Sequence, residues 1–175
     1  MPLAKPGDHP DFFRLPPPPG ASRESSIVLD DQGRFWHDGA LVEHPGMARA
    51  FASWIQRHPD DGRFILSNGF DWTYFTVRDV PYFVKSVRAV DGAPLAELSD
   101  GSEELLDPST LEADASGAVY CRVKSGALAA KFTPGAQTGL APWLAESESG
   151  AIELAVGGRR FRVGERGGQA SGGSH

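Results

Sequence analysis

The sequence has a single cysteine, Cys121, so it cannot form an internal disulfide, and this scarcity fits a reducing compartment. It also lacks an excess of positive charge. The 17 Lys and Arg residues against 23 Asp and Glu residues give a net charge of −6. Because nucleic acids and anionic membranes both favour clustered Lys and Arg, the charge argues against either as a partner.

Long apolar runs are missing as well. No stretch approaches the length that spans a bilayer. In the first twenty residues, MPLAKPGDHPDFFRLPPPPG, the apolar positions are interrupted by Lys5, Asp8, Asp11 and Arg14, which leaves no signal-peptide core. The sequence therefore predicts a cytoplasmic protein without a membrane segment.

What is present favours a globular fold of short elements. Apolar residues make up 40% of the 175 residues and aromatic residues 10%, enough to bury a sizeable core. The 21 glycines and 14 prolines together form one fifth of the chain. This proportion indicates many turns and disfavours a helical bundle.

An internal repeat is indicated by motifs that recur in the same order. GRFWHDGAL, at 33–41, returns loosely as GAVYCRVKSGAL at 117–128. Further anchors recur 84 to 89 residues later, and the offset drifts only where turns are expected. These pairs include Gly33 and Gly117, Pro45 and Pro134, Trp54 and Trp143, and Gly62 and Gly150.

Each repeat is predicted to form a hairpin, a helix and a second hairpin. Pro45 suits the first position of a helix whose buried face carries Met47, Phe51, Trp54 and Ile55, and the motif HPDDG is expected to end it. In the second repeat Pro134 opens a helix that Pro142 breaks.

The predicted fold class is α+β. Two similar units of strand hairpin, helix and strand hairpin pack around a shared core, with short and mostly antiparallel strands. The predicted divisions are a flexible Pro-rich N-terminal arm (1–26), a first α+β unit (27–92), a second α+β unit (93–165) and a disordered Gly-rich tail (166–175).

Four segments carry a resemblance to a known family. They are GRFWHDGALVEHPGMARAFASWIQRHPDDGRFIL, TVRDVPYFVKSV, AVYCRVKSGALAAKF and GAIELAVGGRRFRVG, and the similarity as a whole covers about 26–164. In this order they resemble the bacterial domain-of-unknown-function family 1285 (DUF1285). The resemblance implies an α+β fold with two similar halves and an involvement in signal transduction, and no established enzymatic activity comes with it.

No catalytic or metal-binding constellation is evident. His37 and Asp38 lack further ligands at metal-site spacing, and Cys121 is expected to be a buried thiol. No serine lies in a Gly-x-Ser-x-Gly motif with a flanking strand and helix. The sequence predicts no catalytic residue, metal or cofactor.

The segment NGFDWTYF, 68–75, carries more aromatic residues than one short hairpin needs. Either these rings close the core between the two halves, or they line a ligand pocket. The candidate ligand-binding residues are Asp71, Trp72, Tyr74, Arg78, Asp79 and Tyr82.

The leading functional prediction is a non-catalytic module that binds a small ligand or regulates a partner, with its site between the halves. One alternative is a hydrolase-like enzyme whose carboxylate and histidine groups, such as His37, Asp38 or Asp71, converge between the two units. Another is a protein-interaction or homodimerisation module. The sequence identifies neither the small molecule nor the protein partner.

Overall fold

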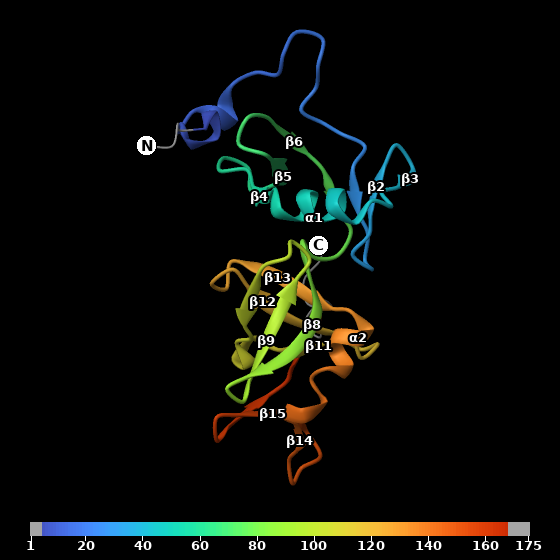
Figure 1. The fold of residues 1–175 in the computed structure, drawn as a ribbon, viewed down its shortest axis with the longest axis vertical. Coiled ribbons are helices and arrows are strands. Elements are labelled where there is room, and N and C mark those ends of the chain that lie inside the picture. The colour runs from blue at the N-terminus through green and yellow to red at the C-terminus, as the bar shows by residue number, and fades with distance from the viewer. Residues whose placement is uncertain (1–4, 168–175) are drawn as a thin grey trace, which may run out of the picture. The chain divides into compact units, whose positions relative to one another are not determined.

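The structure is a computed structural model, and it describes residues 5–167. The chain divides between Pro81 and Tyr82 into two compact units, here called the N-terminal and the C-terminal unit (Figure 1). The division predicted after residue 92 concerns repeated units and stays a prediction. Most of the predicted Gly-rich tail, and the first four residues of the predicted arm, lie outside the described residues.

Among residues 5–81, the N-terminal unit contains two small sheets and one α-helix. It opens with two 3-10 helices, η1 (Pro6–Asp8) and η2 (Phe12–Arg14). Its other elements are β1 (Val28–Leu29), β2 (Phe35–His37), β3 (Ala40–Leu41), α1 (Pro45–Ser53), β4 (Ile55–Arg57), β5 (Phe64–Ser67), β6 (Trp72–Tyr74) and β7 (Thr76–Val77). The sheets have the orders β3-β2-β1-β7, in which β1 and β7 are parallel, and β4-β5-β6.

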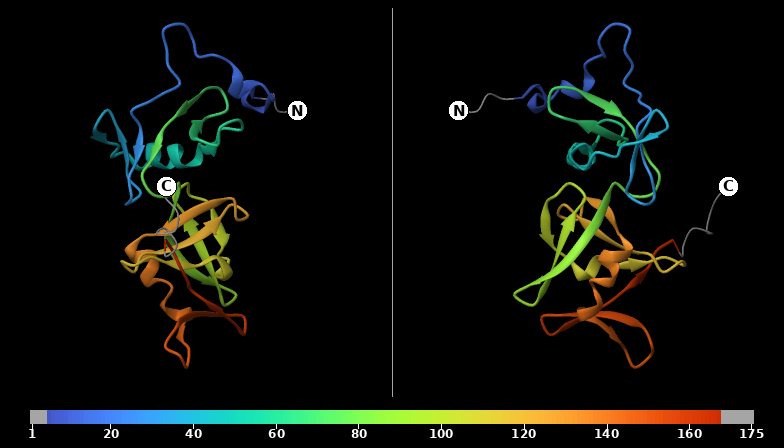
Figure 2. Two further views of the ribbon diagram at one scale, coloured as in Figure 1. Left: turned by 180° about the vertical axis from the view of Figure 1, so that it is seen from behind. Right: turned by 45° about the vertical axis from the view of Figure 1, so that its right-hand side comes forward.

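The C-terminal unit is built on a seven-stranded sheet. Its elements are β8 (Tyr82–Val90), β9 (Ala93–Leu98), β10 (Glu103–Leu105), η3 (Pro108–Thr110), β11 (Glu112–Ala113), β12 (Val119–Val123), β13 (Leu128–Phe132), α2 (Pro134–Thr138), η4 (Ala141–Trp143), β14 (Leu144–Glu146), β15 (Ile152–Val156), β16 (Arg159–Arg162) and β17 (Gly164–Glu165). The large sheet has the order β10-β9-β8-β13-β12-β11-β17, and a smaller one has the order β14-β15-β16. Figure 2 shows the long β8–β9 hairpin from two sides.

The predicted α+β class is confirmed in its broad form. The described chain is mostly β, with two α-helices and a set of antiparallel and mixed sheets. No helix among residues 5–167 is both long and apolar enough to cross a membrane.

The two helices begin where the sequence predicts. The ring nitrogen Nδ1 of His44 accepts hydrogen bonds from the N–H groups of Gly46 and Met47, and the Thr133 hydroxyl accepts one from Ala136. Each cap precedes a proline at the first helical position. Pro142 lies in the short 3-10 turn η4, so the predicted break of the second helix is confirmed.

The predicted end of the first helix is wrong. The helix stops at Ser53, and Ile55 to Arg57 pair with β5 as strand β4. Ile55 is buried through this pairing, whereas Met47, expected on the buried face, is 51% exposed. Helical spacing alone could not reveal that a later strand would compete for these residues.

Candidate ligand-binding site

The hairpin of β5 and β6 holds the segment NGFDWTYF. Asn68 shapes its turn, because the side-chain Oδ1 accepts hydrogen bonds from the N–H groups of Phe70 and Asp71, both at 2.8 Å. Ile65 pairs with Tyr74, and Ser67 pairs with Trp72. Since paired residues share a face, Trp72 and Tyr74 lie on one face of the sheet, and Leu66 and Thr73 lie on the other.

The first face carries an aromatic cluster, which we define as Phe12, Phe13, His58, Trp72 and Tyr74. The His58 ring stacks on Tyr74 with centroids 5.7 Å apart, and Trp72 meets Tyr74 edge-on at 5.1 Å. Phe13 lies 6.0 Å from both Trp72 and His58, and the carbonyl oxygen of Phe13 is 3.0 Å from Nε2 of His58. The described part of the predicted arm therefore packs on this face, while the predicted flexibility of the arm stays a prediction.

Two arginines cover the rings of this cluster. The Arg23 guanidinium lies 4.5 Å from the Trp72 ring and donates hydrogen bonds to Oδ1 of Asp71, at 2.6 Å, and to the carbonyl oxygen of Trp72. Arg63 lies 3.7 Å from the Tyr74 ring. Arg23 thus contacts the Trp72 ring and neutralises the Asp71 carboxylate, and Arg63 contacts the Tyr74 ring.

Hydrogen bonds also set the acidity of these groups. The hydroxyl of Tyr74 donates to Oδ2 of Asp61 at 2.6 Å, which raises the pKa of Tyr74 above its ordinary value. Burial by itself would raise the pKa of Asp71, but the hydrogen bonds from Arg23 and from the Trp72 N–H outweigh it and lower that pKa.

Two polar atoms in this region are buried without a hydrogen-bond partner among residues 5–167. They are Nε1 of Trp72 and Nε of Arg23. Leaving a buried donor unpaired costs about 1–3 kcal/mol. Trp72 is 6% exposed, so its indole N–H is a donor that the described chain leaves unused.

Two hollows adjoin the hairpin, and both are lined by Trp54 and Asn68. The apolar hollow has a volume of about 150 Å³ and is lined by Ile27, Phe51, Trp54, Leu66, Asn68, Asp71, Trp72 and Thr73. The polar hollow has a volume of about 440 Å³ and is lined by Lys5, Gly7, Asp8, Phe13, Ser53, Trp54, Gln56, Ser67, Asn68 and Gly69. Sequence analysis missed Trp54 and Asn68 as site residues, because one fits a buried helix face and the other a turn.

Of the six predicted site residues, the N-terminal unit brings Asp71, Trp72 and Tyr74 together. Arg78 is exposed and lines a separate hollow of about 400 Å³ with Asp30, Arg34 and Trp36. Asp79 is half-buried in the bend after β7.

Tyr82, the sixth predicted residue, opens β8 in the C-terminal unit and is buried there. Burial, with Asp100 and Glu104 nearby, raises the pKa of Tyr82 to about 12. Its ring lies 5.3 Å from Nζ of Lys124. Lys124 donates hydrogen bonds to Asp100 and Ser102. No local motif in the sequence predicts this cluster.

The residues named in the enzyme alternative are each described within the N-terminal unit, and their convergence between the two units stays a prediction. His37 and Asp38 have 57% and 79% exposed side chains, and Asp38 accepts a hydrogen bond from Ser26. Asp71 is paired with Arg23. Burial raises the pKa of Cys121 to about 12, which opposes a nucleophilic thiolate. Residues 5–167 hold no group of three or more His, Cys, Asp or Glu side chains placed to bind a metal ion.

Comparison with known structures finds two proteins with a similar fold. The chain matches the crystal structure of a DUF1285 family protein from Silicibacter pomeroyi DSS-3 with a TM-score of 0.65 and 22% identity, over 89% of this chain and 86% of that one. A DUF1285 family protein from Shewanella baltica OS155 matches with a TM-score of 0.50 and 19% identity, over 65% of this chain and 87% of that one. No family model and no curated protein matches the sequence. The resemblance noted from the sequence is thus confirmed as a structural match over most of the chain.

Proposed function

We propose that the N-terminal unit is a non-catalytic module that binds a small molecule beside the β5–β6 hairpin. The observation that carries this proposal is the pair of hollows beside the hairpin, one apolar and one polar, which share Trp54 and Asn68 in their linings. A ligand that fills both would bury its apolar part in the first hollow and keep its polar part in the second.

The two hollows define the chemistry of the ligand. A volume of about 150 Å³, lined by Phe51, Trp54 and Leu66, suits one small aromatic or aliphatic ring. The adjoining polar hollow, with Lys5 and Asp8, suits a polar extension of the same molecule. The predicted ligand is therefore a small amphiphile with a polar group next to its ring.

The binding test uses three probes of similar size. Benzamide and phenol combine a ring with an acceptor oxygen, and toluene offers the ring alone. We expect benzamide and phenol to stabilise the protein against heat more than toluene does, because only they place a polar group in the polar hollow. Trp54→Ala, which removes a ring from the lining of both hollows, should weaken benzamide binding about tenfold, or about 1.4 kcal/mol. A lack of saturable binding by every probe, or equal binding of benzamide to both proteins, would argue against the site.

A matched pair of variants tests whether the buried indole N–H of Trp72 is unpaired, independently of any ligand. Trp72 and Trp143 are 6% and 8% exposed, but Nε1 of Trp143 donates to the carbonyl oxygen of Gly92 at 2.9 Å. Replacement by Phe removes similar volume at both positions. We expect Trp143→Phe to lower the free energy of unfolding by about 1–2 kcal/mol more than Trp72→Phe, because only the former breaks a hydrogen bond. Equal losses in urea unfolding would show that the Trp72 donor is satisfied.

We also propose that the chain contains the predicted internal repeat, one unit present in two copies. The sheet order β3-β2-β1-β7 corresponds to β13-β12-β11-β17, with antiparallel and parallel pairs in the same places. The meanders β4-β5-β6 and β14-β15-β16 also correspond. Equivalent backbone hydrogen bonds, such as Arg78 N–H to Leu29 and Arg166 N–H to Ala113, support a duplicated unit.

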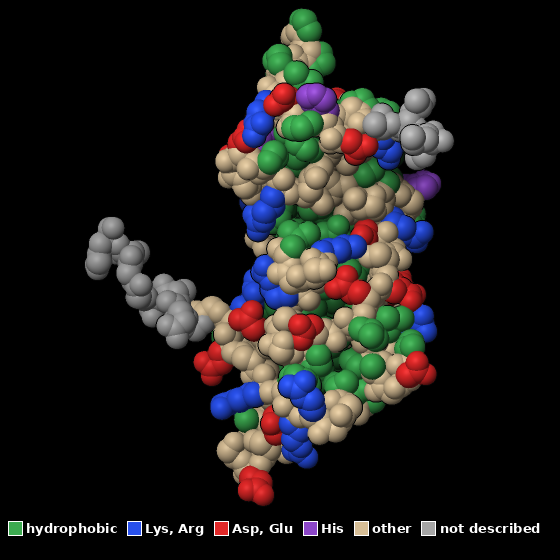
Figure 3. Space-filling view, turned by 90° about the vertical axis from the view of Figure 1, so that its left-hand side faces the viewer, with side chains coloured by type: hydrophobic (Ala, Val, Ile, Leu, Met, Phe, Trp, Pro, Cys, Tyr) green, Lys and Arg blue, Asp and Glu red, His purple; other side chains and the backbone are tan. Residues whose placement is uncertain are grey.

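A regulatory role in the cytoplasm, by way of signal transduction, follows as part of the proposal. A buried free thiol at Cys121 fits a reducing compartment. On the face drawn in Figure 3, Lys and Arg side chains are interspersed with Asp and Glu, which favours partners other than nucleic acids or membranes. Retention on heparin at physiological salt would contradict this choice of partners.

A further inference from the structure

Strand β13 of the C-terminal unit is paired along both of its edges. It is antiparallel to β12 on one side and parallel to β8 on the other, where Ala130, Lys131 and Phe132 face Tyr82, Phe83 and Val84. The N–H group of Thr133 donates to the carbonyl oxygen of Val84 at 3.0 Å. These three β8 residues are at most 3% exposed, so the part of β8 that docks on β13 is buried.

Strand β3 has the same position in the N-terminal unit. Trp36 pairs with Leu41 and His37 with Ala40, as Tyr120 pairs with Lys131 and Cys121 with Ala130. The preceding pairs, Leu29 with Phe35 and Ala113 with Val119, keep these positions in register. Ala40 and Leu41 thus correspond to Ala130 and Lys131, two of the residues against which β8 docks.

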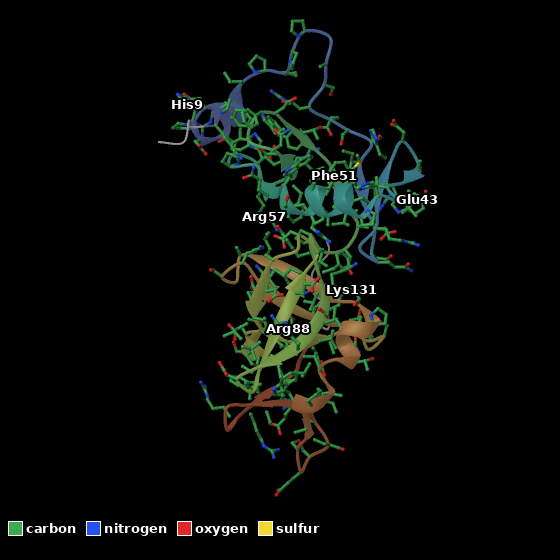
Figure 4. All side chains as sticks on the ribbon, viewed as in Figure 1. His9, Glu43, Phe51, Arg57, Arg88 and Lys131 are labelled. Carbon is green, nitrogen blue, oxygen red and sulfur yellow. The ribbon has the colours of Figure 1, made fainter. Side chains whose placement is uncertain are left out.

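The outer edge of β3 carries no strand among residues 5–167. The N–H group of Val42 donates to the carbonyl oxygen of Phe35, toward β2. Because antiparallel strands alternate the direction of these groups, the N–H and C=O of Leu41 point away from β2. The Leu41 side chain is 38% exposed, and Glu43 follows at the rim of the unit (Figure 4).

We propose that the β3 edge, residues 40–42, binds an extended segment of a partner protein as a parallel strand. The chain provides the precedent, because the equivalent edge in the C-terminal unit is covered by a strand in that orientation. The partner segment would resemble Tyr82–Val84, with adjacent aromatic and β-branched residues. This inference rests on the duplicated unit proposed above, but it concerns a surface other than the proposed ligand site and does not depend on that site.

Segments of this chain are less suitable occupants. In β8 both edges are already used, by β13 and by β9, so a second copy has no free strand of this type to offer. The segment before β1, which corresponds in order to the β8–β10 segment before β11, is tied to the aromatic cluster through Phe12, Phe13 and Arg23. A separate protein is therefore the occupant that the pairing pattern favours.

The helix beside the edge offers further apolar contact. Met47 follows Pro45-Gly46 in α1 as Ala136 follows Pro134-Gly135 in α2. Helix α2 packs against β8, and Ala136 is 1% exposed, whereas Met47 is 51% exposed. The flexible thioether of Met47 can adapt to a range of strand side chains.

A synthetic peptide with the sequence of residues 82–90, YFVKSVRAV, serves as the probe, and its binding to the full chain is measured by fluorescence anisotropy. We expect saturable binding of the peptide and none of a scrambled version. Leu41→Pro removes the outward N–H, for which residues 5–167 provide no strand partner, and should weaken binding at least about tenfold. Amide exchange at Leu41 should slow in the complex.

Two lysine variants control for non-specific hydrophobic binding of the peptide. Leu41→Lys should weaken binding, while Ile152→Lys, at a 51% exposed apolar residue of the C-terminal unit, should not. Circular dichroism shows whether each variant keeps its fold. Absence of binding, or equal binding by Leu41→Pro and the native chain, overturns the proposal. A dimer that light scattering detects and that Leu41→Pro dissolves would assign the edge to a second copy instead and overturn the choice of a partner protein.

Discussion

At the residue scale, the C-terminal unit contains a polar cluster whose members are all paired. Nζ of Lys124 donates to Oδ2 of Asp100 at 2.8 Å and to the hydroxyl oxygen of Ser102 at 2.9 Å. Lys124 and Ser125 both have a positive φ, a backbone conformation that is unfavourable for residues other than glycine. The ion pair with Asp100 therefore helps to hold a turn that the backbone alone would not choose.

Asp100 makes stability depend on pH. Burial by itself would raise the pKa of Asp100, but the hydrogen bonds from Lys124 and Ser102 outweigh it and lower that pKa below the ordinary value. Because the pKa is lower in the folded state, the Asp100 charge stabilises the protein at pH values above the pKa of an unfolded aspartate, about 3.9. This stabilisation is lost as the pH falls through the pKa of the folded state.

Asp100→Asn tests this dependence. We expect the variant to be less stable than the native chain by about 1–2 kcal/mol at neutral pH, and the difference to shrink below about pH 4. Urea unfolding at a series of pH values measures both. Glu148→Gln, at an exposed carboxylate in the turn after β14, is the control and should show no such gap. A constant difference across the series would contradict the role of the Asp100 charge.

At the scale of elements, the segment before β1 bears on the stability of the N-terminal unit. Phe12 is 6% exposed and forms a core cluster with Ile65 and Trp72. We expect Phe12→Ala to lower the free energy of unfolding by about 3 kcal/mol, through lost burial and a residual cavity. Leu15→Ala, at a 56% exposed side chain of the same segment, should cost less than about 0.5 kcal/mol. Equal and small effects would mean that the segment is a detached arm.

The sequence predicted elements well where the signal is local. His44 and Thr133 precede Pro-Gly pairs and cap helices, and Pro142 interrupts the second one. It failed where a distant residue competes, because Ile55 leaves the helical pattern to pair with β5. The sequence also did not predict that Phe12 packs on Trp72, sixty positions away, because the proline content that suggests a flexible arm is local information. The flexibility of the arm stays a prediction.

The candidate site was predictable only in its centre. The surplus of rings in NGFDWTYF pointed to Trp72 and Tyr74, which do lie together. The partners that hold them, Arg23 and His58, come from other parts of the chain and carry no motif. Tyr82 is near them in sequence, but it opens β8 and belongs to the C-terminal unit.

At the scale of the whole molecule, the question is whether one folding unit occurs twice. The turn between β4 and β5 contains Gly62, and the turn between β14 and β15 contains Gly150, which the repeat makes equivalent. Both have a positive φ, 73° and 85°. An added Cβ would meet nothing within 4 Å at Gly62 and only a side-chain oxygen of Glu146 at 3.7 Å at Gly150, so the backbone conformation alone decides the penalty.

If these turns are equivalent, Gly62→Ala and Gly150→Ala should each lower the free energy of unfolding by about 1–2 kcal/mol, the penalty of a left-handed conformation for alanine. Because the turns share no hydrogen-bond partner, the losses should add in the double variant within about 0.5 kcal/mol. Gly135→Ala is the control. That glycine lies in α2 with open space around its Cα and no positive φ, so alanine should be neutral or stabilising there. Urea unfolding of the four variants measures these effects, and a loss at Gly62 without one at Gly150 would argue that the second turn is not a copy of the first.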